Sequence, residues 1–112
     1  MFREFIETNE FQKKWTGLGL SDIDLLELEV FLCKNPQFGD VIARTGGLRK
    51  LRWGCKGRGK RGGIRVVYID FVLYEKIYLI TAYAKNEKDN LVESEKKQIK
   101  IFIKNLEDEL GK

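Results

Sequence analysis

The sequence predicts an α+β protein in which helices pack against one small sheet. Two segments with helical spacing of apolar residues follow a short alternating segment, three strand-like segments come next, and an amphipathic segment ends the chain. The expected order of elements is therefore β-α-α-β-β-β-α. A chain of 112 residues with 43% hydrophobic content is long enough for one core, so we expect a single domain over residues 1–112.

The first half of the chain should supply one strand and two helices. Residues 2–6 alternate apolar and polar side chains imperfectly, which predicts a short strand. Thr8 or Asn9 is expected to cap a helix that continues to residue 15 and ends at the glycines 17 and 19. Ser21 and Asp24 have the spacing of a capping box, with Asp in the place of Glu, and the helix after them should end near residue 34, before the only proline.

The second half should supply a three-stranded antiparallel meander. Residues 37–47 have the composition of a loop, and residues 48–53 alternate so that Leu48, Lys50 and Arg52 share one face. The next ten residues hold five glycines and four cations, which predicts a flexible connection. Residues 64–71 and 77–83 are rich in β-branched and aromatic residues and should form two strands joined by a turn near residues 73–76.

A last helix is expected from residue 91 or 92 to residue 110, with Gly111 at its end. Its apolar residues have helical spacing and should face the core. Its charged residues are expected to form a solvated face: Glu93, Glu95, Lys96, Lys97, Lys100 and Lys104.

The charge of the chain is strongly polarised. Residues 44–65 hold nine of the 21 Lys and Arg residues, and no Asp or Glu lies between Asp40 and Asp70. This segment carries +9 while the other residues sum to −5, although the net charge is only +4. Such a concentration of cations attracts a polyanion through phosphate neutralisation and counterion release, which favours nucleic acid as a partner.

Several classes of protein are disfavoured by composition. There is no histidine and no CxxC motif, so neither a zinc site nor a disulfide framework is expected, and the two cysteines should be free thiols. No apolar run approaches the ~20 residues that span a bilayer, and the N-terminal residues are acidic where a signal peptide is basic. We therefore expect a cytoplasmic protein without metal or cofactor.

Two glycine motifs in the basic segment satisfy nucleotide-binding patterns. Gly57, Gly59 and Gly62 fit GxGxxG, but a strand pattern follows them where a dinucleotide site needs a helix. Residues 54–60 fit GxxxxGK, but Arg61 stands where a phosphate-binding loop needs Ser or Thr. Neither motif is expected to bind a nucleotide. A loop of glycines and cations is instead suited to a phosphate backbone.

Four strings in fixed order carry a resemblance to a known family. They are GDVI at 39–42, TGGLRK at 45–50, KGRGKRGG at 56–63 and KNE at 85–87. Across roughly residues 36–100 the chain resembles the RelE superfamily of toxins, specifically the HigB-like branch of type II toxin-antitoxin systems. The resemblance implies a RelE-like fold, with a small curved antiparallel sheet and helices packed on one side. It also implies an endoribonuclease toxin that cuts mRNA in the ribosome without metal and is neutralised by a cognate antitoxin.

The resemblance also implies where the site lies. The family's alternating cations correspond to Lys50 and Arg52, and the arginine of its Arg-aliphatic-aliphatic-Tyr motif corresponds to Arg65. This chain departs from RelE-type members at Asn86, which follows Lys85 where they carry an arginine, and it has no tyrosine after Tyr83.

The chemistry of RNA cleavage by its own 2′-hydroxyl needs a base, charge stabilisation at the phosphorane and a proton for the leaving 5′-oxygen. Arg52 and Arg65 are expected to stabilise charge, and Lys50 or Lys85 could act as the base, with Glu87 a weaker candidate. Tyr83 or Trp53 could stack on an RNA base, the alternative being that these rings and Tyr68 belong to the core. The further residues expected to contact RNA are Arg49, Lys56, Arg58, Lys60, Arg61 and Asn86.

Two other functions fit the same residues. A ParE-like inhibitor of DNA gyrase would bind its target without cutting RNA. A non-catalytic RNA-binding module would use the cations for attraction alone, because phosphate contacts position a protein on nucleic acid without implying scission.

Overall fold

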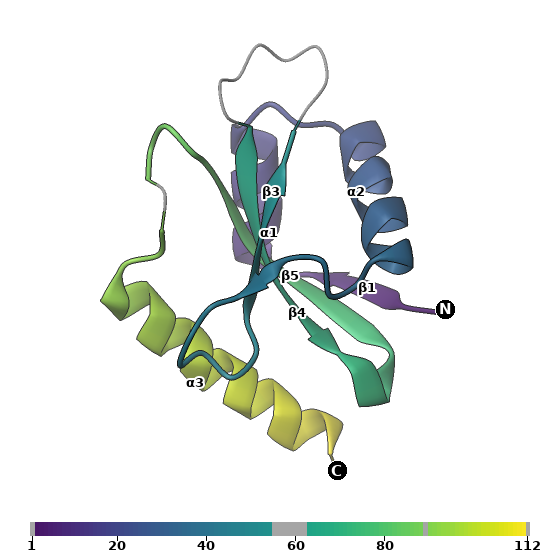
Figure 1. Cartoon of the computed structure of the whole chain (residues 1–112), viewed down its shortest axis with the longest axis vertical. Coiled ribbons are helices and arrows are strands. Elements are labelled where there is room, and N and C mark those ends of the chain that lie inside the picture. The colour runs from purple at the N-terminus through teal and green to yellow at the C-terminus, as the bar shows by residue number, and fades with distance from the viewer. Residues whose placement is uncertain (1, 55–62, 89, 112) are drawn as a thin grey trace.

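The computed structural model of the chain describes residues 2–54, 63–88 and 90–111. Its regular elements run from a short strand, through two helices, into a run of strands and a long final helix (Figure 1). They are β1 (Glu4–Glu7), α1 (Asn9–Gly17), α2 (Asp22–Lys34), β2 (Asp40–Val41), β3 (Arg49–Trp53), β4 (Ile64–Phe71), the 3-10 helix η1 (Val72–Tyr74), β5 (Lys76–Ala84) and α3 (Glu93–Leu110). The predicted α+β class is confirmed.

The strands form one sheet in the order β1-β5-β4-β3-β2. The pairs β3–β4 and β4–β5 are antiparallel, as the predicted meander requires. The expectation of a purely antiparallel sheet was wrong, because β1 pairs with β5 in parallel. The two helices after β1 carry the chain away from this edge, and a long connection of this kind allows a parallel neighbour.

The prediction of a loop over residues 37–47 was wrong at Asp40–Val41, which form β2 and pair with β3. Tertiary contacts hold this short strand in place. The Gly39 N–H donates to the buried Tyr68 hydroxyl at 3.0 Å, and Arg49 Nη1 donates to the carbonyls of Gln37 and Gly39 at 3.0 and 2.7 Å. Burial raises the pKa of Tyr68, so its hydroxyl stays neutral while it accepts this bond.

Helices cover both faces of the sheet, which corrects the expectation that they all pack on one side. Helices α1 and α2 pack on one face through residues such as Phe11, Leu28 and Leu32. The apolar face of α3 packs on the other, around Ile103 (Figure 1). Residues 64–69 of β4 are all buried, as expected for a strand with a core on each side.

The helix boundaries follow the predicted caps. Thr8 caps α1 by accepting from the Phe11 N–H at 3.0 Å. Ser21 and Asp24 form the predicted capping box at the start of α2, with reciprocal bonds of 3.2 and 2.8 Å. No helix among the described residues is long and apolar enough to cross a membrane.

A buried ion pair joins the N-terminus to the sheet. Arg3 donates through Nε to Asp70 Oδ1 at 2.7 Å and through Nη2 to Asp70 Oδ2 at 3.3 Å. Both side chains are almost inaccessible, and the bond to Asp70 raises the pKa of Arg3. Separating the two side chains would leave a buried charge without its partner, which is costly. The pair therefore holds the residues just before β1 against the sheet.

Candidate functional site

Three of the predicted cations project from one face of the sheet. Arg52 in β3 stands directly opposite Arg65 in β4, and Arg65 stands opposite Tyr83 in β5. Lys50 lies two residues before Arg52 and faces Val67, so alternation places it on the same side. This is the face on which α3 packs, since Val67 and Tyr83 belong to the core that includes Ile103. Lys50, Arg52 and Arg65 are called the cationic triplet below.

The members of the triplet lie at different depths. Arg52 is exposed and Lys50 is half-buried, whereas Arg65 is only 1% exposed. Tyr83, beside Arg65, is 3% exposed, so its ring is a core aromatic and cannot stack on an RNA base in this conformation. A phosphate at the surface would therefore contact Arg52 and Lys50 directly and would sense Arg65 as a charge beneath them.

Lys50 is held by a residue from the connection between β5 and α3. Its Nζ donates to Asn90 Oδ1 at 2.6 Å. This bond brings the connection to β3, 40 residues away in sequence. The bond thus restricts the position of the Lys50 ammonium.

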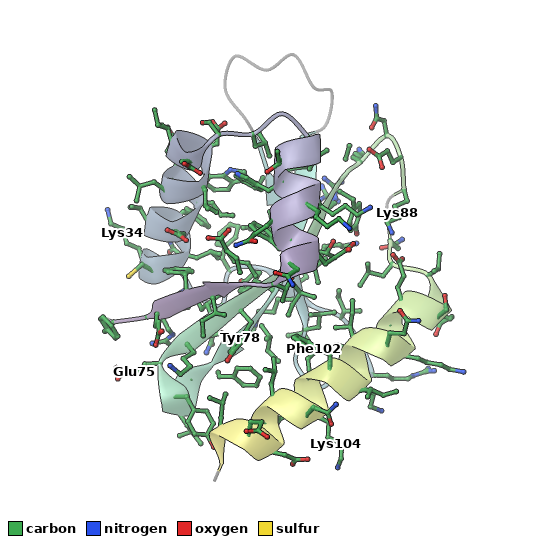
Figure 2. The ribbon with its side chains drawn as sticks, turned by 180° about the vertical axis from the view of Figure 1, so that it is seen from behind. Lys34, Glu75, Tyr78, Lys88, Phe102 and Lys104 are labelled. Atoms are coloured by element: carbon green, nitrogen blue, oxygen red, sulfur yellow. The ribbon has the colours of Figure 1, made fainter. Side chains whose placement is uncertain are left out.

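A lysine of the same connection, Lys88, lies over the ring of Tyr83. Lys88, labelled in Figure 2, has its Nζ 5.1 Å from the centre of the Tyr83 ring, and it pairs with Glu95 of α3 at 2.6 Å. Burial raises the pKa of Glu95, but the bonds from Lys88 and from the Val92 N–H outweigh it, so the pKa lies below its ordinary value. The Glu95 carboxylate therefore fastens the connection to the first turn of α3.

The turn after β5 carries three further predicted residues. Lys85, Asn86 and Glu87 are exposed in a turn closed by the Glu87 N–H donating to the Ala84 carbonyl at 3.1 Å. The Lys85 N–H donates at 3.4 Å to the carbonyl of Gly63, the residue immediately before β4. The turn therefore lies at the same end of the sheet as Arg52 and Arg65, and its side chains are accessible to a ligand there.

Two residues predicted to contact RNA lie on the other face. Arg49 bonds the carbonyls of Gln37 and Gly39, and Trp53 packs against Phe31 of α2 with ring centres 5.4 Å apart. Both alternate with Lys50 and Arg52 along β3. The structure therefore does not bring them to the cationic triplet.

Four other predicted cations fall outside the described residues: Lys56, Arg58, Lys60 and Arg61. The predicted connection over residues 54–63 and both glycine motifs lie there almost entirely. Within the described part of the chain, no three His, Cys, Asp or Glu side chains gather closely enough to hold a metal ion.

The electrostatics of the triplet favour an anionic ligand. Side chains directly opposite across an antiparallel pair have Cβ atoms about 4.5–5.5 Å apart, and like charges at such positions destabilise the sheet. Arg52 and Arg65 occupy one such pair. An anion bound there would reduce the repulsion between the two side chains.

Sequence reasoning missed Asn90 and Lys88. Neither carries a local signal, because the contacts of Asn90 with Lys50 and of Lys88 with Tyr83 depend on where the connection folds back over the sheet. The sequence could have suggested Asn90 and Lys88 only if the order of the strands in the sheet had been known, because that order decides which strand the connection lies beside.

Residues 6–110 match the family model described as the RelE toxin of the RelE / RelB toxin-antitoxin system. The matched range extends from β1 to the last residue of α3 and includes every residue of the cationic triplet.

Proposed function

Because the chain belongs to the RelE toxin family and is therefore the toxin of a toxin-antitoxin system with a cognate antitoxin, we propose that it is a ribosome-dependent endoribonuclease that cleaves translated mRNA. We also propose that it belongs to the HigB-like branch, because of the strings at 39–42, 45–50, 56–63 and 85–87. The single observation that supports cleavage best is the cationic triplet on one face of the sheet, beside the exposed Lys85–Glu87 turn.

In the proposed reaction the RNA supplies its own nucleophile. The 2′-oxygen forms a bond to phosphorus, the bond from phosphorus to the 5′-oxygen breaks, and the products are a 2′,3′-cyclic phosphate and a 5′-hydroxyl. The 2′-hydroxyl proton passes to a base and the 5′-oxygen takes up a proton. Negative charge grows on the non-bridging oxygens of the phosphorane, where fixed cations stabilise it most.

The depths of the cations suggest distinct roles. Arg52 is exposed and would contact the non-bridging oxygens with its planar fork, while Lys50 would hold the same phosphate or its neighbour. Arg65 lies beneath and would contribute fixed positive charge in a poorly solvated position, where electrostatic effects are stronger. Proton transfer would fall to the exposed turn, with Lys85 and Glu87 as the alternatives and Asn86 beside them.

The proposal is tested by mapping RNA ends. After brief expression of the protein, new 5′ ends inside the codons of translated messages are expected, and they should disappear when translation initiation is blocked. Arrested replication with intact messages would instead indicate a gyrase inhibitor of the ParE type. RNA binding with neither effect would indicate a non-catalytic module.

Matched variants on one strand sharpen this test. Arg52→Ala should abolish most cleavage, because it removes the exposed charge at the phosphorane, on the order of a hundredfold or more by analogy with loss of one oxyanion donor. Arg49→Ala removes the same charge from the other face of β3 and should retain cleavage wherever the protein is folded. Equal loss in both variants would contradict the proposed site.

A further inference from the structure

A basic hollow lies between the turn that joins β2 to β3 and the N-terminal half of α3. It encloses about 440 Å³ and is lined by Ala43, Arg44, Glu93, Lys96, Lys97 and Lys100. On α3 these residues follow one flank of the helix, because positions three and four apart lie on the same side. The sequence alone suggested a solvated face here, whereas the structure sets this flank against a second cationic element.

The charge of the basic hollow is strongly positive. Four cations line it against one carboxylate, which gives a formal sum of +3. Glu93 pairs with Lys96 at 3.4 Å, but Glu93 is 84% exposed, so this pair is weak and screened by solvent. The hollow therefore attracts anions, and Glu93 is the one group in its lining that opposes them.

Arg44 reaches the hollow from a strained position. Its φ is 63°, in the left-handed region that disfavours residues with a Cβ. The turn around it is fixed by hydrogen bonds: Thr45 Oγ1 donates to the Ile42 carbonyl at 2.6 Å, and the Leu48 N–H donates to Thr45 Oγ1 at 3.2 Å. Arginine at a position that suits glycine is unfavourable for stability alone, and such strain points to a role for the side chain.

The hollow lies on the same side of the sheet as the cationic triplet. Helix α3 packs on the face from which Lys50 and Arg52 project. Along the chain, β3 leads from the turn that holds Arg44 to Lys50 and then Arg52, and Lys50 is bonded to Asn90 just before α3. The cationic side chains thus form a row that runs from Arg52 past Lys50 to the basic flank of α3.

The two flanks of α3 differ in chemistry. The opposite flank borders a groove of about 360 Å³ with apolar lining from Ile80, Ile99 and Phe102 and with the carboxylates of Glu10 and Glu95. Figure 2 shows Phe102 and Lys104 at different sides of this helix. Apart from Ala43, the lining of the basic hollow has no apolar residue, and cations alone are sufficient to bind a nucleic acid backbone.

We propose that the basic hollow binds a phosphodiester of an RNA strand that also lies across the cationic triplet. The proposal rests on the proposed function, because it extends that RNA site beyond the scissile phosphate. Arg44, Lys97 and Lys100 hold the backbone there through their charges, and the lining has no aromatic ring on which a base could stack.

The first test measures binding without cleavage. A short, fluorescently labelled single-stranded RNA with 2′-O-methyl groups cannot be cut by its own hydroxyls, so its affinity is independent of the catalytic proposal. Lys97→Ala combined with Lys100→Ala should weaken binding on the order of tenfold at low salt. The slope of log K against log salt should fall by about 0.7, the value for one phosphate contact of a single strand. The control is Lys13→Ala combined with Lys34→Ala, which removes the same charge from α1 and α2 and should bind as the parent does.

Two variants separate binding from folding. Glu93→Gln removes the opposing carboxylate and should tighten binding severalfold, which an unfolded protein would not do. Arg44→Gly should raise the melting temperature, because glycine suits φ 63°, and should still weaken binding. A rise in melting temperature with unchanged affinity would overturn the role of Arg44 and with it the proposal.

The source of the phosphodiester is distinguished by a second arm. Sedimentation with purified ribosomes replaces the oligonucleotide in this arm. Weaker binding in both arms identifies the strand that lies across the cationic triplet and supports the proposal, whereas weaker binding to the ribosome alone identifies ribosomal RNA and overturns it. Unchanged affinity for both the oligonucleotide and the ribosome overturns the proposal. If the variant instead loses only its binding of the cognate antitoxin, the hollow binds a protein and the proposal is likewise overturned. The parent protein could also show no cleavage while the double lysine variant still binds the oligonucleotide more weakly. That result would refute the nuclease proposal and would still support the RNA site in the basic hollow.

Discussion

Lys50 Nζ and Asn90 Oδ1 lie 2.6 Å apart and join β3 to the connection before α3. The contact links one cation of the proposed cleavage site to the helix that lines the basic hollow. The amide of Asn90 therefore contributes to the position of the ammonium, although Asn90 itself is exposed.

Asn90→Ala should lower the rate of mRNA cleavage while leaving the free energy of unfolding within about 1 kcal/mol of the parent, as expected for one exposed hydrogen bond. Asn90→Asp should lower the rate further, because a carboxylate would pair with Lys50 and compete with the phosphate. Single-turnover cleavage on programmed ribosomes and urea unfolding measure the two effects. A variant Asn90→Asp as active as the parent would show that Lys50 does not contact the phosphate.

Arg52→Ala is expected to stabilise the empty protein. It removes one of two like charges that face each other across β3 and β4, so the free energy of unfolding should rise by about 0.2–1 kcal/mol. Arg49→Ala should instead lower it by about 1 kcal/mol or more, because the carbonyls of Gln37 and Gly39 lose their donor. Urea unfolding of both variants at low ionic strength makes the comparison, and a destabilised Arg52→Ala would mean that repulsion within the pair is already compensated.

Tyr68→Phe should destabilise the protein by about 1–3 kcal/mol, because the buried Gly39 N–H loses its acceptor. The loss should be concentrated at β2, where amide hydrogen exchange of Asp40 and Val41 would become fast. Tyr74→Phe is the matched control: Tyr74 is 39% exposed, so the change should stay within about 0.5 kcal/mol. Equal stability of the two variants would show that β2 does not depend on this bond.

Acidification should weaken the attachment of the β5–α3 connection. The pKa of Glu95 lies below its ordinary value of 4.5, so the folded protein holds the carboxylate more strongly than the unfolded chain does. The resulting stability is present above pH 4.5 and is lost as the pH falls through the folded-state pKa. Because Glu95 is over a third exposed, the contribution should stay under about 1 kcal/mol.

Thermal unfolding from pH 7 to pH 3 should therefore show a smaller loss of stability in Glu95→Gln than in the parent. Lys88→Met removes the partner and should reduce the acid sensitivity in the same direction. A parallel pH profile in all three proteins would contradict the role assigned to this ion pair.

The parts of the fold that the sequence predicts well are those whose signals are local. The Thr8 cap, the box of Ser21 and Asp24 and the β-branched run of β4 each act within a few residues, and each lies where it was expected. Alternation along β3 likewise sufficed to place Lys50 and Arg52 on one face and Trp53 on the other. The short strand β2 has no such local signal. Its two residues pair with β3 only when Tyr68 and Arg49 hold the backbone of the residues before them.

The sequence by itself determined the class of fold, the concentration of positive charge and the alternation that aligns two cations, because spacing and composition act along the chain. Only the tertiary structure decided that Arg65 stands opposite Arg52 but lies beneath the surface, and that α3 covers the face opposite α1 and α2. It alone also brought Asn90 to Lys50 and Arg44 to the flank of α3. The physical reason is that these relationships depend on strand register and on the packing of distant apolar faces, which no local pattern encodes.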